Sequence, residues 1–170
     1  KEEDYHFTTV GSVKVSNLMF GQWECQQIDG PKVKLVQVEG EGDVVATRRS
    51  MMESLVGTKY EGKFPPHVVG LNCGAGNAQE CIVHNEEFVR GYKDYILGLD
   101  NDEATPAEQL RGIKKGKEAA EDIASYLLME NIYVLDFGKY KDPREMLDDG
   151  KAVELGKMIS FEAKRYSPEK

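Results

Sequence analysis

The fold prediction rests most on the stretch Val33-Lys34-Leu35-Val36-Gln37-Val38, which is followed by Glu39-Gly40-Glu41-Gly42. The apolar residues form a short run typical of a strand, and the Glu-Gly repeat after it is typical of a turn. Comparable short runs separated by Gly-rich turns cover residues 5–48. This pattern predicts an antiparallel β meander at the start of the chain.

The middle of the chain combines a predicted hairpin with a predicted helix. Two short apolar segments, 67–71 and 81–83, flank a Gly-Ala-Gly-Asn sequence, which indicates two strands joined by a flexible loop. After Asn85, apolar residues recur at spacings of three and four, and Gly98 follows as a stop signal. We therefore expect a helix between Asn85 and Gly98.

The second half of the chain carries the clearest helix signals. Thr105-Pro106-Ala107-Glu108 matches a capping box with Pro in the first turn, which predicts the longest helix at about residues 106–129. A strand is predicted over 132–137, and Asp142-Pro143 predicts a short helix that ends near Gly150. An N-terminal meander packed against C-terminal helices is an α+β fold, and no composition break divides the single domain predicted for residues 1–170.

Charge and composition restrict the classes of partner. The chain carries 30 acidic and 22 basic residues, a net charge of −8, and this sign disfavours binding to nucleic acid, which needs clustered Lys and Arg. No apolar run approaches the ~20 residues of a transmembrane helix. The odd number of cysteines favours free thiols and a soluble protein of a reducing compartment: cytosol, mitochondrial matrix or plastid stroma. Lys1 at the start fits a processing site, an engineered boundary or an internal position of a longer chain.

Cys73 is the candidate nucleophile, since small residues surround it in Gly70-Leu71-Asn72-Cys73-Gly74-Ala75-Gly76-Asn77. A reactive thiol needs a base or a cation nearby, and His67 or His84 could lie across the predicted hairpin. The alternative is that Gly and Asn only provide a flexible connection between two strands, and we favour that structural role.

Neither a metal nor a cofactor is predicted. The spacing of Cys73, Cys81 and His84 does not match a zinc site. Asp100, Asp102 and Glu103 lack the Gly and Glu that complete a calcium-binding loop. We interpret these acidic residues as a linker that caps the helix after it, because carboxylates near a helix N-terminus are favoured by its dipole.

The long predicted helix contains Gly112, Lys114, Lys115, Gly116 and Lys117. Two glycines inside a helix cost roughly 1 kcal/mol each relative to Ala, so close packing should compensate. Gly116 falls on the apolar stripe of this helix and is predicted to touch another backbone. The three lysines form a small basic spot, which is either a solvated face or a binding surface.

Gly21-Gln22-Trp23 resembles the Gly-x-Trp opening of lipocalin-like barrels. The resemblance covers these three residues and a helix placed late in the chain, and the even succession of strands through the middle is lacking. It implies a carrier of a small apolar ligand, with Trp23 near the ligand.

No combination of acid, base and nucleophile emerges, so the sequence favours a protein that is not an enzyme. Eight Tyr, one Trp and the Gly-containing helix supply contact surfaces. The leading hypothesis is a non-catalytic accessory or extrinsic subunit that docks on a larger protein assembly through protein–protein interaction. A small thiol-dependent enzyme using Cys73 and a lipocalin-like carrier are the alternatives.

Overall fold

The structure is a computed structural model that describes residues 17–72, 74–102, 105–110 and 115–167. The strands are β1 (Met19–Phe20), β2 (Lys34–Val38), β3 (Val68–Leu71), β4 (Asp94–Gly98), β5 (Ile132–Val134) and β6 (Lys164–Arg165). The helices are α1 (Gln22–Gln27), α2 (Glu41–Glu53), η2 (Ala75–Asn77), α3 (Ala78–His84), α4 (Glu86–Arg90), α5 (Pro106–Leu110), α6 (Gly116–Leu127), α7 (Pro143–Asp148), α8 (Ala152–Lys157) and η3 (Met158–Glu162).

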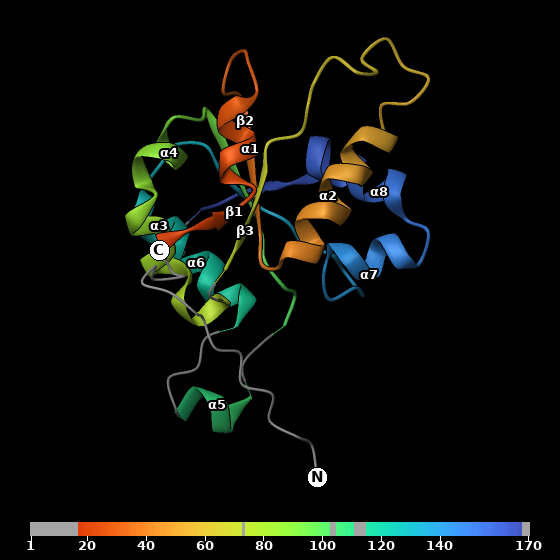
Figure 1. Cartoon of the computed structure of the whole chain (residues 1–170). Coiled ribbons are helices and arrows are strands. Elements are labelled where there is room, and N and C mark those ends of the chain that lie inside the picture. The colour runs from red at the N-terminus through yellow and green to blue at the C-terminus, as the bar shows by residue number, and fades with distance from the viewer. Residues whose placement is uncertain (1–16, 73, 103–104, 111–114, 168–170) are drawn as a thin grey trace, which may run out of the picture.

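A mixed sheet with the strand order β1-β3-β2-β4-β5-β6 forms the centre of the molecule (Figure 1). The four inner strands run parallel, and the short outer strands β1 and β6 pair antiparallel. Because inner parallel strands are covered on both faces, they are mostly apolar, with Lys34 and Gln37 of β2 and Asp94 of β4 as exceptions. Leu35, Val36 and Val38 of β2 are fully buried accordingly.

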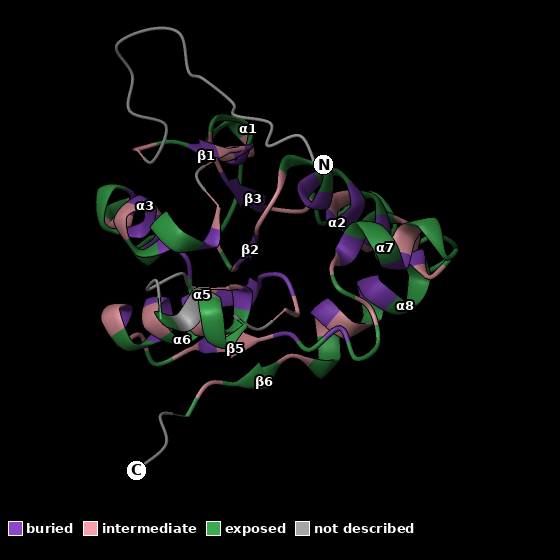
Figure 2. Ribbon diagram, turned by 90° about the horizontal axis from the view of Figure 1, so that it is seen from below, coloured by how far each residue is buried: buried purple, intermediate pink, exposed green. Residues whose placement is uncertain are grey.

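Helices cover both faces of the sheet, which gives three layers (Figure 2). One core includes Ile82 of α3 and Ile123 of α6 against one face. The other core includes Val44 of α2, Met146 of α7 and Leu155 of α8 against the opposite face. Because the four inner strands are parallel, their carboxyl ends lie together along one edge of the sheet and their amino ends lie together along the opposite edge.

The predicted α+β class is confirmed, but the predicted arrangement of the first half is wrong. No antiparallel meander covers the described part of residues 5–48, because β2 pairs in parallel with β3 and β4. The Glu-Gly repeat begins α2 instead of a hairpin, and the Asp43 carboxylate accepts a hydrogen bond of 2.9 Å from the Gly40 N–H. Residues 81–83 lie in α3, whereas 68–71 form β3 as predicted.

The predicted helices of the second half are partly confirmed. The helix expected between Asn85 and Gly98 ends at Arg90 in α4, and the rest forms strand β4 between β2 and β5. The helix expected over 106–129 is divided, since Lys115 is extended (φ −111°, ψ 178°) and α6 begins after it. The Glu108 side chain, expected to reach back to the cap, lies outside the described side chains. In α7, by contrast, Asp142 caps as predicted and accepts from the Glu145 N–H at 2.7 Å.

Within the described ranges, no helix combines the length and the apolar character that crossing a membrane requires.

Candidate functional site

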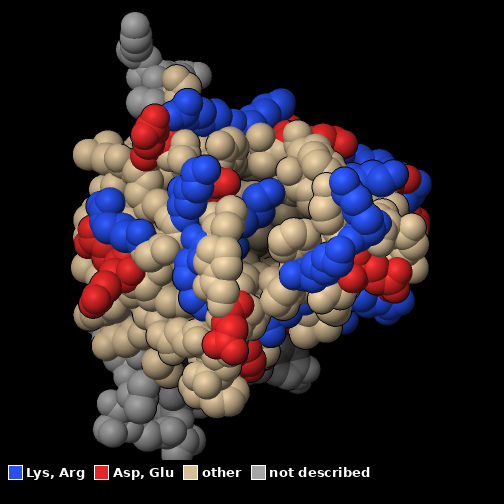
Figure 3. Space-filling view, turned by 90° about the horizontal axis from the view of Figure 1, so that it is seen from above, with Lys and Arg blue, Asp and Glu red and all other residues tan. Residues whose placement is uncertain are grey.

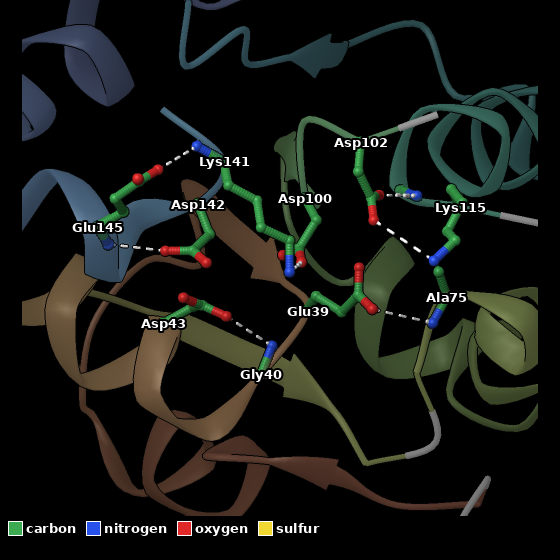
Figure 4. A network of polar contacts seen from close by, with 11 residues as sticks. Glu39, Gly40, Asp43, Ala75, Asp100, Asp102, Lys115, Lys141, Asp142 and Glu145 are labelled. Carbon is green, nitrogen blue, oxygen red and sulfur yellow. Dashed lines mark hydrogen bonds and ion pairs between the residues drawn. The ribbon is translucent and has the colours of Figure 1, made fainter. Parts of the chain in front are cut away.

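Carboxylates gather where the parallel strands end. Glu39 directly follows β2, and Asp100 and Asp102 follow β4. The helices that begin at this edge add Asp43, in the first turn of α2, and Asp142, the N-cap of α7. We call these five residues the acidic edge (Figure 4). Ligands of open α/β sheets bind outside the carboxyl ends of the strands, so the acidic edge lies where a functional site is expected.

Glu39 is a partly buried member of the acidic edge. One carboxylate oxygen accepts a hydrogen bond of 3.3 Å from the Ala75 N–H, and the other, Oε2, is buried and has no hydrogen-bond partner among the described residues. Burial, and then the negative charge of Asp100, raises the pKa of Glu39 to about 6. Among the described residues, no Lys or Arg forms an ion pair with the Glu39 carboxylate, so its charge is not compensated by them.

The pKa values of Asp43 and Asp100 are raised as well. Burial raises the pKa of Asp43. The hydrogen bond from the Gly40 N–H lowers it, and the negative charges of Asp142 and Asp100 raise it further. Burial also raises the pKa of Asp100, although its bond to Lys141 opposes this shift. Like charges held close together in a partly buried place are expensive unless a cation neutralises them.

Two lysines supply part of that neutralisation. The Lys141 ammonium lies 2.8 Å from the Asp100 carboxylate, and the Lys115 ammonium lies 3.8 Å from the Asp102 carboxylate. Asp102 also accepts a hydrogen bond of 3.1 Å from the Gly116 N–H. The connections that lead into α6 and α7 thus each place one cation at the acidic edge (Figure 4).

Gly116 confirms the predicted close approach to another backbone. A Cβ atom at Gly116 would lie 2.0 Å from the carbonyl oxygen of Asp100. Only glycine fits, because a side chain would collide with main-chain atoms that cannot rotate away. Gly116 therefore fixes the distance between α6 and the segment that carries Asp100 and Asp102.

The raised pKa of Glu39 predicts a pH-dependent stability. Its pKa in the fold, about 6, exceeds the ordinary 4.5, so the fold is favoured while Glu39 is protonated and this contribution is lost as pH rises toward 6. Glu39→Gln should raise the free energy of unfolding by about 2 kcal/mol at pH 7.5 and change it little at pH 4.5. Urea unfolding at both pH values measures this, and an equal difference at both would contradict it.

The carboxylates are oxygen donors, yet in the described ranges no group of three or more His, Cys, Asp or Glu side chains is gathered tightly enough to hold a metal ion. Asp100 and Asp102 face lysines instead of a shared centre. Carboxylate oxygens are nonetheless the ligands that Mg²⁺ takes in proteins. The unpartnered Oε2 of Glu39 and the raised pKa values of Glu39 and Asp100 match a site that gains from a cation.

Most residues singled out from the sequence lie elsewhere. His67 precedes β3 at the opposite edge of the sheet and hydrogen-bonds the Tyr92 hydroxyl at 2.8 Å. His84 ends α3, where its ring lies 3.8 Å from Glu80. Trp23 is 69% exposed on α1, a helix and not the strand expected for a lipocalin-like barrel.

Only part of the predicted basic spot belongs to the acidic edge. Lys115 and Gly116 contact Asp102, and Lys117 lines a cavity next to Asp100. Cys73, Gly112 and Lys114 lie outside the described residues.

The sequence contains a signal for the site that was interpreted differently. Val38-Glu39 and Leu99-Asp100-Asn101-Asp102 each place carboxylates directly after a buried apolar run. In isolation the first pattern predicts a turn and the second a linker. Recognising two such runs as neighbouring parallel strands would have brought Glu39, Asp100 and Asp102 together.

Two solved structures resemble the chain over most of its length. One is a primase domain in the structure of the bacteriophage T7 lagging-strand DNA polymerase interacting with primase domains bound to an RNA/DNA hybrid and dTTP. It is 27% identical, with a TM-score of 0.68, and the match covers 96% of this chain and 69% of that one. The other is the primase fragment of the bacteriophage T7 primase-helicase protein, which is 29% identical with a TM-score of 0.61.

The second match covers 88% of this chain and 51% of the primase fragment, so the chain spans about half of that fragment. No family model and no curated protein matches the chain.

The predicted function is wrong. A non-catalytic accessory subunit without a nucleic-acid partner does not fit a chain whose structural neighbours are primase domains, one of them in a complex with an RNA/DNA hybrid. The alternatives, a thiol-dependent enzyme and a lipocalin-like carrier, fail on the same comparison.

Proposed function

We propose that this chain is the catalytic domain of a primase-like nucleotidyltransferase, which joins ribonucleotides along a nucleic-acid template. The observation that carries the proposal is the position of Glu39, Asp100 and Asp102 at the carboxyl ends of two adjacent parallel strands. The similarity to T7 primase domains over 96% of the chain supports the choice of reaction.

In this reaction the 3′-hydroxyl oxygen of a growing strand forms a bond to the α-phosphorus of a nucleoside triphosphate. The bond between that phosphorus and the oxygen that bridges it to the β-phosphate breaks. Pyrophosphate leaves, and the hydroxyl proton passes to solvent. A triphosphate carries several negative charges, and the acidic edge alone would repel it. The site therefore has to be neutralised before the substrate can bind.

Mg²⁺ is usually held by one or two carboxylates together with substrate phosphates, so Glu39, Asp100 and Asp102 would supply its protein ligands without forming a closed three-residue cage. When bound, Mg²⁺ neutralises the phosphates and stabilises the charge that develops in the transition state. The chain's own contribution is to hold the three carboxylates on rigid strand ends, with Gly116 fixing the approach of α6. Lys115 and Lys141 keep Asp102 and Asp100 neutralised in this structure.

A cavity of about 460 Å³ beside the acidic edge offers room for the nucleotide. Asp100 and Asp136 line it from the strand ends, and Lys117 and Lys164 line it from α6 and β6. Cavities of a few hundred Å³ with a few polar groups are typical of small-molecule sites. The mixture of carboxylates and ammonium groups suits a substrate that is bound through its phosphates.

An extension assay on a supplied RNA/DNA hybrid tests the proposal. The full chain is incubated with a short RNA strand paired to a longer DNA template, the four ribonucleoside triphosphates and Mg²⁺. We expect RNA strands lengthened in steps of one nucleotide, stoichiometric pyrophosphate, and no product in the presence of EDTA. The absence of lengthened RNA and of pyrophosphate at every Mg²⁺ concentration would overturn the proposal.

A further inference from the structure

The opposite edge of the sheet has a different character. The loops at residues 28–33 and 57–66 lie at the amino ends of β2 and β3, away from the acidic edge (Figure 1). Seen from this side, Lys and Arg side chains surround a hollow (Figure 3). On a chain with a net charge of −8, this gathering of cations marks a separate surface.

The hollow is an apolar pocket of about 380 Å³. Val33, Met51, Leu55 and Phe64 are among its lining residues, with Pro65 and Pro66 beside them. Its size and lining suit a flat apolar group such as one aromatic ring system.

Lysines outnumber acidic residues in the lining of this pocket. Lys34 and Lys63 line it, with Asp29 as an acidic member of the lining. The Lys34 ammonium donates to the carbonyl oxygens of Ile159 and Ser160, at 3.3 and 3.4 Å, and neither partner carries a charge. Burial lowers the pKa of Lys34, against the charge of Asp94, so an anion near this ammonium would stabilise its charged form.

The loop above the pocket alternates lysines with exposed aromatic rings. Tyr60 and Phe64 are 44% and 62% exposed, and their ring centroids lie 5.8 Å apart. The Lys59 ammonium lies 4.9 Å from the centroid of the Tyr60 ring. Exposed rings between cations are the means by which proteins bind single-stranded nucleic acid without sequence preference.

We propose that this second surface binds single-stranded nucleic acid. One base stacks on Phe64 at the mouth of the apolar pocket, and the ammonium groups of Lys34 and Lys63 bind the adjacent phosphates. The choice of nucleic acid as the anion rests on the proposed function, whereas the pocket, the rings and the lysines do not. The surface lies across the sheet from the acidic edge, so it holds a strand independently of the catalytic carboxylates.

Fluorescence anisotropy with a labelled ten-nucleotide oligothymidylate, in EDTA, measures binding to this surface. Phe64→Ala should weaken binding about tenfold through lost stacking. Lys63→Met should lower the slope of log K against log salt by about 0.7, the value for one phosphate contact of a single strand. An abasic strand of the same length should bind the wild type about tenfold more weakly than the oligothymidylate.

Lys151→Met is the matched control, because Lys151 lies between α7 and α8 and pairs with Glu154 at 2.9 Å. It should leave the affinity and the salt slope unchanged. Equal affinities for the wild type and Phe64→Ala, or for the abasic and the base-containing strand, would overturn the proposal. Tighter, Phe64-dependent binding to phosphatidylglycerol vesicles than to the oligonucleotide would assign the surface to a membrane instead and would also overturn it.

The outcomes separate the two proposals. If the oligonucleotide binds as described but no RNA is lengthened, only the proposed catalytic function fails. If RNA is lengthened but Phe64→Ala and Lys63→Met bind the strand like the wild type, only this second surface fails.

Discussion

The Asp100→Asn variant is expected to lose nucleotide incorporation by about a hundredfold or more while its thermal stability stays equal or rises. Asparagine keeps one oxygen donor but loses the negative charge that would hold Mg²⁺ beside the reacting phosphates, and losing such an electrostatic group costs about 10²–10³ in rate. The expected thermal stability of the variant has a separate reason. The pKa of Asp100 is raised by burial, so the fold disfavours its ionised form, and a neutral isostere relieves that cost.

Asp148→Asn is the matched control for this experiment. Asp148 is 72% exposed on α7, where it lies 3.9 Å from Arg144. Its replacement should change neither the rate of incorporation nor the melting temperature by a measurable amount. Extension assays and thermal melts of the two variants side by side are decisive: full activity of Asp100→Asn would remove Asp100 from the site.

Gly116→Ala is expected to destabilise the chain by about 2 kcal/mol, although alanine is the better helix former. The new Cβ atom would lie 2.0 Å from the carbonyl oxygen of Asp100 and 2.7 Å from its amide nitrogen. Overpacking of this kind costs about 1–3 kcal/mol, and Gly116 is the first residue of α6, where alanine gains less than the roughly 1 kcal/mol that it adds in a helix interior. Incorporation should fall as well, because the clash displaces the segment that carries Asp100 and Asp102.

Gly76→Ala provides the comparison for this variant. Gly76 lies in η2 with no heavy atom within 4 Å of its would-be Cβ, so its replacement should shift the free energy of unfolding by less than about 0.5 kcal/mol. Urea unfolding curves of both variants give the difference. Similar small shifts at Gly116 and Gly76 would show that α6 can move away from Asp100.

Local signals predicted some elements of the fold correctly. Asp142-Pro143 specifies the start of α7 through one side-chain cap and one fixed backbone angle, and both lie within four residues. The close approach at Gly116 was predicted from the cost of a glycine inside a helix; the contact is present, although Gly116 is the first residue of α6 and not an interior one. The start of α7 depends on neighbours in the sequence, so the sequence alone suffices for it, whereas the partner of Gly116, the backbone of Asp100, could not be read from the sequence.

Pairing between distant residues was beyond such reasoning. The apolar positions of residues 95–99 fit helical spacing, but Ile96 pairs with Val36 on one side and with Tyr133 on the other. The parallel direction of β2 and β3 likewise depends on the pairing of Val36 with Val68. A short apolar run cannot show which of these structures it adopts.

The candidate site was missed for the same reason. Glu39 and Asp100 become neighbours only when β2 and β4 lie side by side, and each alone resembles a turn or a capping residue. The argument from net charge failed because −8 is a sum over the whole chain. The acidic edge and the lysines around the apolar pocket lie on different sides of the molecule, so the net charge of the whole chain describes neither surface.

The dispersal of the acidic edge along the chain, from Glu39 to Asp142, also bears on how the protein is made. A nascent chain that ends before β5 already contains Glu39, Asp100 and Asp102. It still lacks Lys141 and β5, which is one of the two neighbours of β4. In such an intermediate the carboxylate of Asp100 has no ammonium partner from the later segment. Since domains fold as units during synthesis, the complete acidic edge, and with it the proposed activity, would arise in one late step, after Lys141 and α7 have left the ribosome.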